Sequence, residues 1–126
     1  MIHNRYIPNE EIEKFFVAAD ALVLPYLSGS QSAVGMLALH HGVPVIATDV
    51  GGLSETVVHE QTGLIVPPRD SLALAEAIER FFSQRLGDGF RAAIGETRDR
   101  LSWSALIRLI EEMSRELAEH AAARRL

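Results

Sequence analysis

Three short apolar runs separated by helical patterns constrain the fold of this chain more than any other feature. The runs are residues 21–25, 43–48 and 64–66, and each is shorter and more continuously apolar than an amphipathic helix. Strands that alternate with helices pair in parallel, because each helical crossover returns the chain to the same end of the sheet. With 48% hydrophobic residues among 126, the chain can bury such a sheet on both faces. The pattern predicts an α/β fold: an open, doubly wound parallel sheet with helices on both faces.

Helical patterns fill the intervals between these runs. Asn9 is a candidate N-cap, followed by Glu10 and Glu11, where carboxylates suit the positive end of the helix dipole. Further helices are expected over residues 31–41, 53–59, 71–82 (with Asp70 as N-cap) and 88–100, and a last one begins at Ser102 as N-cap. A weak first strand is expected over residues 2–7, ahead of Pro8.

The same patterns predict two parts: a sheet-containing domain, residues 1–83, and a C-terminal helical segment, residues 84–126, packed on it. The last helix carries an apolar stripe with spacings of 3 and 4, which predicts a face that docks on the core or at an interface. The stripe consists of Trp103, Leu106, Ile110, Met113 and Leu117.

Charge and cysteine content exclude several classes of function. The formal net charge is −5, so neither a nucleic acid nor an anionic membrane is expected as a partner. With no cysteine, the chain has no disulfide scaffold, cysteine-ligated zinc or thiol nucleophile. His40 and His41 are adjacent and point to different sides of a helix, so no metal is expected there. No apolar run is long enough for a signal peptide or a membrane span, which predicts a cytoplasmic protein.

The first loop, residues 26–32, follows the first apolar run. In open α/β sheets, ligands bind where loops leave the carboxyl ends of strands and enter helices. Gly29 and the flanking serines would let a phosphate approach the free amides that open the next helix. The other interpretation is a polar loop whose serine caps that helix. No lysine follows, so the loop is not a Walker motif.

The second loop, residues 48–55, follows the second run. Its paired glycines, Gly51 and Gly52, allow positive φ and the close approach of a ligand. A tight turn with Glu55 in the first turn of a helix explains the same residues.

The identities of the residues indicate more about function than the pattern of apolar and polar positions does. Residues 19–25, 42–55 and 61–68 resemble, in order and spacing, the donor-binding domain of family 4 (group 1) glycosyltransferases. The resemblance covers about residues 7–82 and continues more loosely through Trp103. It implies a Rossmann-like domain of the two-domain GT-B fold. It also implies sugar transfer from a nucleotide-diphosphate donor with retention of anomeric configuration, and no metal or other cofactor.

The resemblance also implies which residues meet the donor. Two glutamates of the family, which contact the donor's sugar and ribose, are replaced here by Gly29 and Leu37. Residues 31–34 resemble a branch of the family that lacks both carboxylates. The backbone of the first loop is implied to meet the diphosphate, with the paired glycines and a glutamate beside the donor. The implied donor-binding residues are Gly29, Ser30, Gln31, Ser32, Ala33, Gly51, Gly52 and Glu55.

In the family, an acceptor domain and the Arg and Lys that neutralise the diphosphate precede these motifs, and Arg5 is the one basic candidate here. The chain is therefore expected to be a C-terminal part of the enzyme that binds a nucleotide sugar but transfers none by itself. The alternative is a non-catalytic binding or assembly module. Such a module would self-associate or pair with a missing subunit through an exposed apolar sheet edge.

Overall fold

The computed structural model describes residues 2–100 and 103–123. The chain divides into two compact units, Met1–Gly95 and Glu96–Leu126, with the division inside helix α5 (Leu86–Arg100). Ser102, the predicted N-cap of the last helix, lies outside the described residues.

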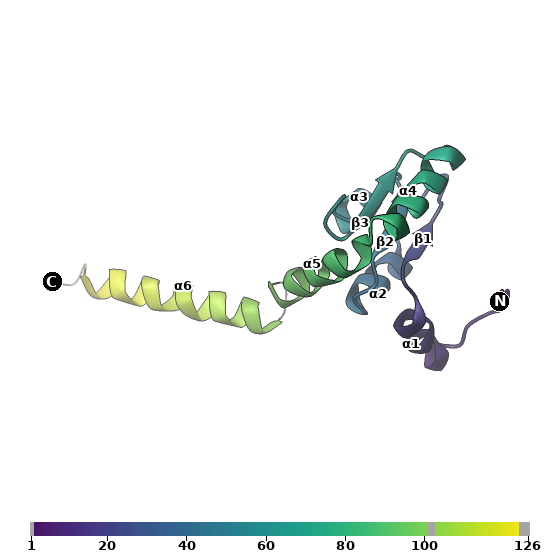
Figure 1. Cartoon of the computed structure of the whole chain (residues 1–126). Coiled ribbons are helices and arrows are strands. Elements are labelled where there is room, and N and C mark those ends of the chain that lie inside the picture. The colour runs from purple at the N-terminus through teal and green to yellow at the C-terminus, as the bar shows by residue number, and fades with distance from the viewer. Residues whose placement is uncertain (1, 101–102, 124–126) are drawn as a thin grey trace. The chain divides into compact units, whose positions relative to one another are not determined.

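The first unit is built on a parallel sheet in which the three apolar runs are the three strands (Figure 1). The strands are β1 (Leu22–Leu24), β2 (Val45–Thr48) and β3 (Gly63–Val66), in the order β1-β2-β3. Leu22 pairs with Val45, which pairs with Gly63, so the carboxyl ends of all three strands lie at one edge. The predicted open parallel sheet is confirmed.

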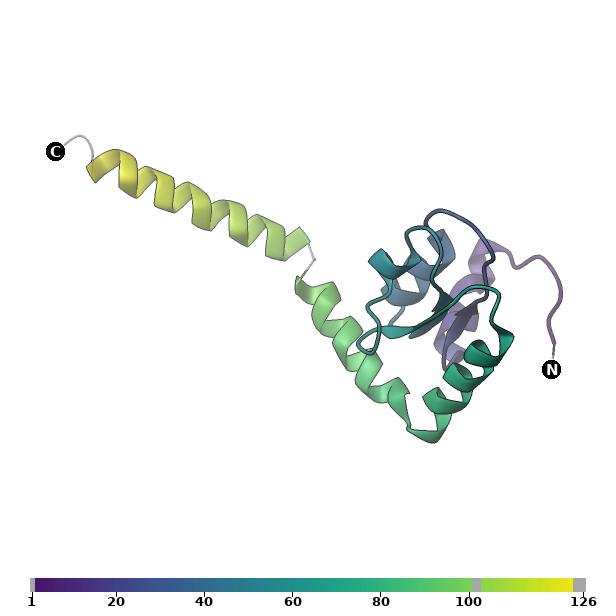
Figure 2. The same cartoon turned by 90° about the horizontal axis from the view of Figure 1, so that it is seen from above.

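Helices cover both faces of this sheet, as predicted (Figure 2). One face carries α1 (Asn9–Ala18), α2 (Ala33–His40) and α3 (Leu53–Thr56), whose Phe16, Ala38 and Leu53 share a core cluster. The other face carries α4 (Ser71–Ser83) and the start of α5, whose Ala77, Phe81 and Phe90 share a second cluster.

Strand β2 separates the two clusters because its side chains alternate between the faces. Val45 and Ala47 belong to the first cluster, whereas Ile46 belongs to the second. All four residues of β2 are buried, as a central strand between two helical layers requires.

The predicted first strand is absent: residues 2–7 form no strand. A strand is stable only when its backbone groups pair with a neighbour, and this segment pairs with no part of the sheet. The side chains of Ile2 and Tyr6 are 92% and 82% exposed. Pro8, rather than Asn9, is the N-cap of α1, while Glu10 and Glu11 lie in its first turn as expected.

Two further expectations need correction. Strand β1 was expected to be buried on both faces, but it lies at the sheet's edge and Val23 is 37% exposed. Helix α3 ends at Thr56 rather than at residue 59, because Val57 takes an extended conformation and is buried in the first cluster.

Helix α4 starts as predicted, with the side chain of Asp70 accepting a hydrogen bond from Ala73 N at 2.9 Å. Phe81 is buried, whereas Phe82 is 56% exposed. Helix α5 is held to the unit by buried Phe90 and Ile94, and its Arg91 donates to the carbonyl of Ala19 at 3.3 Å.

The second unit consists mainly of α6 (Trp103–Ala123). Four members of the predicted stripe are exposed, from Leu106 at 45% to Leu117 at 70%. Within residues 2–100 and 103–123, no helix has both the length and the apolar character that crossing a membrane requires.

Candidate functional site

The two loops singled out in the sequence leave the carboxyl ends of neighbouring strands. The first loop (residues 26–32) connects β1 to α2, and the second loop (residues 48–55) runs from the end of β2 into α3. Because β1 and β2 pair directly, the two loops emerge side by side at one edge of the sheet.

The backbones of the loops touch at Gly51. This residue has φ +53°, and a Cβ on it would stand 2.0 Å from the carbonyl oxygen of Gly29. The same atom would stand 2.9 Å from Ser30 Cα. No side chain fits in this space, so glycine at position 51 lets the two loops form one continuous surface.

The side chains of Gln31 and Glu55 both lie close to Gly52. A Cβ on Gly52 would stand 2.9 Å from Gln31 Cγ and 3.7 Å from Glu55 Oε2. Both side chains are exposed, so an amide and a carboxylate are available beside the glycine pair. The structure thus brings together the predicted residues of both loops.

Ser32 is the N-cap of α2, so the expected serine cap is present, but the helix begins at Ala33 rather than at residue 31. The Oγ of Ser32 accepts a hydrogen bond from Gly35 N at 3.2 Å, and the residue is only 5% exposed. Ala33 is the first residue of α2, and no acidic side chain lies in that first turn. The Ser32 side chain therefore serves the helix, which leaves the backbone as the part of Ser32 that a ligand would contact.

The positions of the two missing family glutamates differ in character. A Cβ on Gly29 would meet Tyr26 Cδ2 at 3.8 Å, an ordinary van der Waals distance, so this position has room for it. Leu37, in contrast, packs against the first core cluster. Its side chain contributes to the fold.

Arg5, the basic candidate, is engaged elsewhere. Its guanidinium pairs with Glu11 of α1, and this hydrogen bond holds the pKa of the Glu11 carboxyl below its ordinary value. The two loops themselves contain Asp49 and Glu55 and no lysine or arginine. Their attraction for an anion rests on backbone amides.

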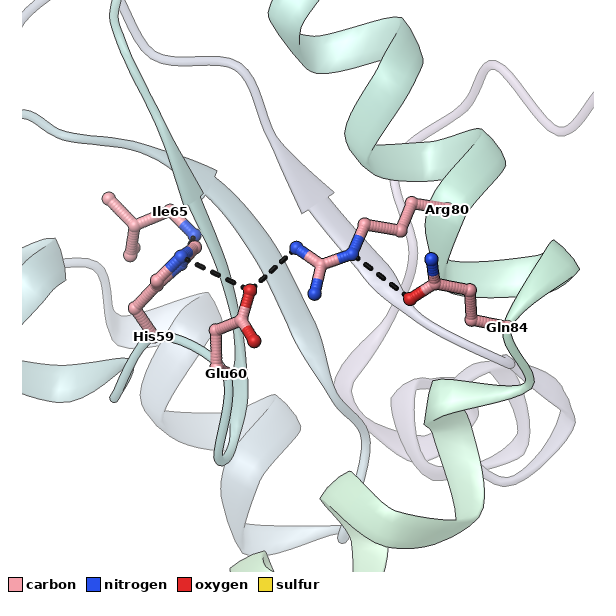
Figure 3. Close-up of polar contacts among 5 residues, drawn as sticks. All are labelled: His59, Glu60, Ile65, Arg80 and Gln84. Atoms are coloured by element: carbon pink, nitrogen blue, oxygen red, sulfur yellow. Dashed lines mark hydrogen bonds and ion pairs between the residues drawn. The ribbon is translucent and has the colours of Figure 1, made fainter.

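A second polar cluster, which the sequence did not indicate, joins the turn before β3 to β3 and α4 (Figure 3). Arg80 of α4 donates to Glu60 Oε1 at 2.5 Å and to Gln84 Oε1 at 3.1 Å. The bond to Arg80 lowers the pKa of Glu60, and the carboxylate in turn raises the pKa of Arg80. Glu60 and Arg80 are 20 residues apart, so no local pattern could have paired them.

His59 completes this cluster. Its Nδ1 accepts a hydrogen bond from Ile65 N of β3 at 2.9 Å, and its Nε2 lies 3.6 Å from Glu60 Oε1. No group of three or more His, Asp or Glu side chains suited to a metal ion occurs within the part of the chain that the structure describes. The cluster ties the turn before β3 to α4.

Comparison with known proteins decides the family. Residues 2–84 match the family described as glycosyl transferases group 1. The chain belongs to this family. The resemblance seen in its motifs is thereby confirmed, as is the Rossmann-like character of the domain within the GT-B fold.

Individual group 1 glycosyltransferases match most of the chain. It is 37% identical over 102 residues to the D-inositol 3-phosphate glycosyltransferase of Pseudarthrobacter chlorophenolicus, covering 79% of this chain and 24% of that protein. It is 33% identical over 117 residues to the enzyme of the same name from Mycobacteroides abscessus, covering 92% and 26%.

Among solved structures, the sucrose-phosphate synthase of Thermosynechococcus elongatus superposes with a TM-score of 0.64 at 34% identity, covering 90% of this chain and 29% of that one. The group 1 chain thus spans about a quarter of the length of these relatives. Two of these relatives are named for D-inositol 3-phosphate and the third for sucrose phosphate.

Proposed function

We propose that this chain is part of the donor-binding half of a retaining glycosyltransferase, and that its two loops receive the diphosphate of a nucleotide sugar. The observation that carries the proposal is the backbone contact between Gly51 and Gly29–Ser30. It merges two amide-rich loops into one surface at the edge of the sheet where open α/β folds bind ligands. Family membership supplies the class of ligand.

The chemistry at this surface is electrostatic. When the bond between the sugar and the diphosphate breaks, negative charge builds on the leaving diphosphate, and preorganised amide donors stabilise it. Because the two loops contain no lysine or arginine, the cations that complete this stabilisation belong to other parts of the enzyme. This chain would therefore bind the donor but would not by itself catalyse the transfer reaction.

Calorimetry with UDP, GDP and their sugar conjugates tests the proposal on the complete 126-residue chain. We expect binding in the micromolar to low-millimolar range. Ser30→Asp places a negative charge in the first loop and should weaken binding of the diphosphate severalfold. Ser83→Asp makes the same change in charge at the far end of α4 and should leave the affinity unchanged. Failure of every nucleotide to bind would contradict the proposal.

Activity provides a second test. The isolated chain should neither transfer sugar to an acceptor nor hydrolyse the donor, because the acceptor site and the cationic groups are expected outside it. Turnover clearly above background by the pure chain would show that the chemistry resides here instead.

A non-catalytic assembly module is the second candidate, and a specific surface favours it. An apolar pocket of about 280 Å³ opens between α1 and α2, lined by Ile7, Ile12, Phe15, Phe16, Val34 and Leu37. Apolar surface of this kind favours association with another chain. Light scattering tests the self-association that this candidate predicts, and a clean monomer at high concentration counts against it.

A further inference from the structure

One buried hydroxyl links the ends of the two strands from which the loops emerge. Thr48 is the last residue of β2 and only 4% exposed. Its Oγ1 donates to the carbonyl of Tyr26 at 2.6 Å and lies 3.4 Å from the carbonyl of Leu24, the last residue of β1. The hydroxyl therefore holds the entrance of the first loop against the end of the neighbouring strand.

The Tyr26 side chain fixes the other end of the same loop. Its hydroxyl lies 3.3 Å from Ser32 Oγ, which caps α2 through Gly35 N. Tyr26 is thus bound twice, by its carbonyl to Thr48 and by its hydroxyl to the cap of α2. The residues between these anchors, numbers 27–31, are all exposed.

Thr48 and Tyr26 thus hold the loop in place, while the exposed residues 27–31 are the ones that a ligand can contact. A loop anchored at both ends presents its amides without first being ordered, and the entropy of ordering is a main cost of binding by flexible segments. Preorganised donors are also the ones that stabilise charge best, since they need not reorient.

We infer that Thr48 and Tyr26 are positioning residues that hold the first loop in the shape in which its amides bind the donor's diphosphate. The inference rests on the proposed function for the class of ligand. The anchoring of the loop by Thr48 and Tyr26 does not depend on that function and can be tested without a ligand.

Thr48→Val tests the hydroxyl, because valine keeps the shape of threonine and removes the donor to Tyr26. Loss of one such hydrogen bond should weaken UDP binding by about two- to tenfold. Thr48→Ser restores the hydroxyl and should restore the affinity. Unchanged UDP affinity in a folded Thr48→Val protein that binds UDP in its parent form would overturn the inference.

Tyr26→Phe is the second variant, and it removes only the hydroxyl that reaches Ser32. Tyr26 is half-buried, so this change keeps the packing of the ring and provides a folded variant even where Thr48→Val does not. The same loss of affinity is expected, and unchanged binding would contradict the role of this side chain.

A measurement without ligand distinguishes failure of the inference from failure of the proposed function. In ¹⁵N NMR spectra, the amide signals of Gly29 and Ser30 should shift or broaden in Thr48→Val and return to their original positions in Thr48→Ser. Unchanged signals would overturn the inference whatever the protein binds. Altered signals in a protein that binds no nucleotide would uphold the anchoring and refute the proposed ligand.

Discussion

At the scale of single residues, the site depends on position 51 being glycine, which has no side chain. Gly51 combines a positive φ with the close approach of another loop, so both its backbone conformation and its surroundings exclude a Cβ. A position under two such constraints tolerates no other residue without movement of the backbone.

Gly51→Ala should therefore lower the free energy of unfolding by at least about 1–2 kcal/mol, from the left-handed conformation alone. The contact with Gly29 O adds to this loss. Urea denaturation monitored by circular dichroism measures the change.

Gly89→Ala is the matched control. Gly89 lies inside α5, and a Cβ on it would meet nothing within 4 Å. Alanine there should raise the stability by about 0.5–1 kcal/mol, because glycine is the poorer helix former. Equal effects of the two substitutions would mean that Gly51 is an ordinary turn residue.

The ion pair of Glu60 and Arg80 predicts a dependence on pH. The pKa of Glu60 is lowered from its ordinary 4.5 in the folded protein, chiefly by the hydrogen bond from Arg80. The contribution of this pair is therefore present above the unfolded pKa and disappears as the pH falls through the folded value. Glu60→Gln should lower the melting temperature slightly at pH 7, and the difference should vanish under acid conditions.

Glu79→Gln serves as the control for this experiment, because Glu79 makes no ion pair among the residues that the structure describes. Its effect on the melting temperature should be small at both pH values. A difference between the parent protein and Glu60→Gln that does not change with pH would contradict the assignment. High salt should reduce the effect, since both partners are partly exposed.

How far single residues can be predicted depends on whether their partners are near in sequence. Asp70 caps a helix that begins one residue later and was identified from the sequence, whereas for α2 only a serine cap was expected and Ser32 was not named. The bonds of Thr48 to Tyr26 and of Arg80 to Glu60 join residues 22 and 20 positions apart. They depend on how strands and helices pack, which no local pattern specifies.

At the scale of elements, α4 gives the clearest case of a helix start determined by one side chain. Asp70→Ala removes the acceptor for Ala73 N and should cost about 1 kcal/mol of stability. Asp70→Asn keeps a side-chain oxygen that can accept the same hydrogen bond, so this variant should retain most of the stability. Urea unfolding of the two variants provides the comparison, and equal losses would indicate that the negative charge, rather than the cap, is what matters.

The strands show why some elements could be predicted and one could not. The runs 43–48 and 64–66, which correspond to β2 and β3, were recognised because burial on both faces requires a continuous apolar run. Residues 2–7 have only three apolar side chains in six, Ile2, Tyr6 and Ile7, and a strand also needs a neighbour with which to exchange hydrogen bonds. Whether a neighbouring strand is present depends on the rest of the structure, so it cannot be predicted from the sequence of residues 2–7 alone.

At the scale of the whole molecule, the two units should differ in their local stability. The residues of β2 are completely buried, whereas the described apolar side chains of α6 are at least 45% exposed. Hydrogen exchange on the complete chain should therefore find the slowest amides in β2 and faster ones in α6. Equal protection of both elements in dilute solution would contradict this expectation.

The imidazole of His59 has a consequence for how the sheet can grow. By accepting the outward N–H of Ile65, it occupies the place that a carbonyl of a fourth strand would take beside β3. Addition of a strand at that edge would first have to displace the ring. The two edges of the sheet therefore differ: a strand added beside β3 would compete with the imidazole for Ile65 N, whereas the other edge is formed by β1.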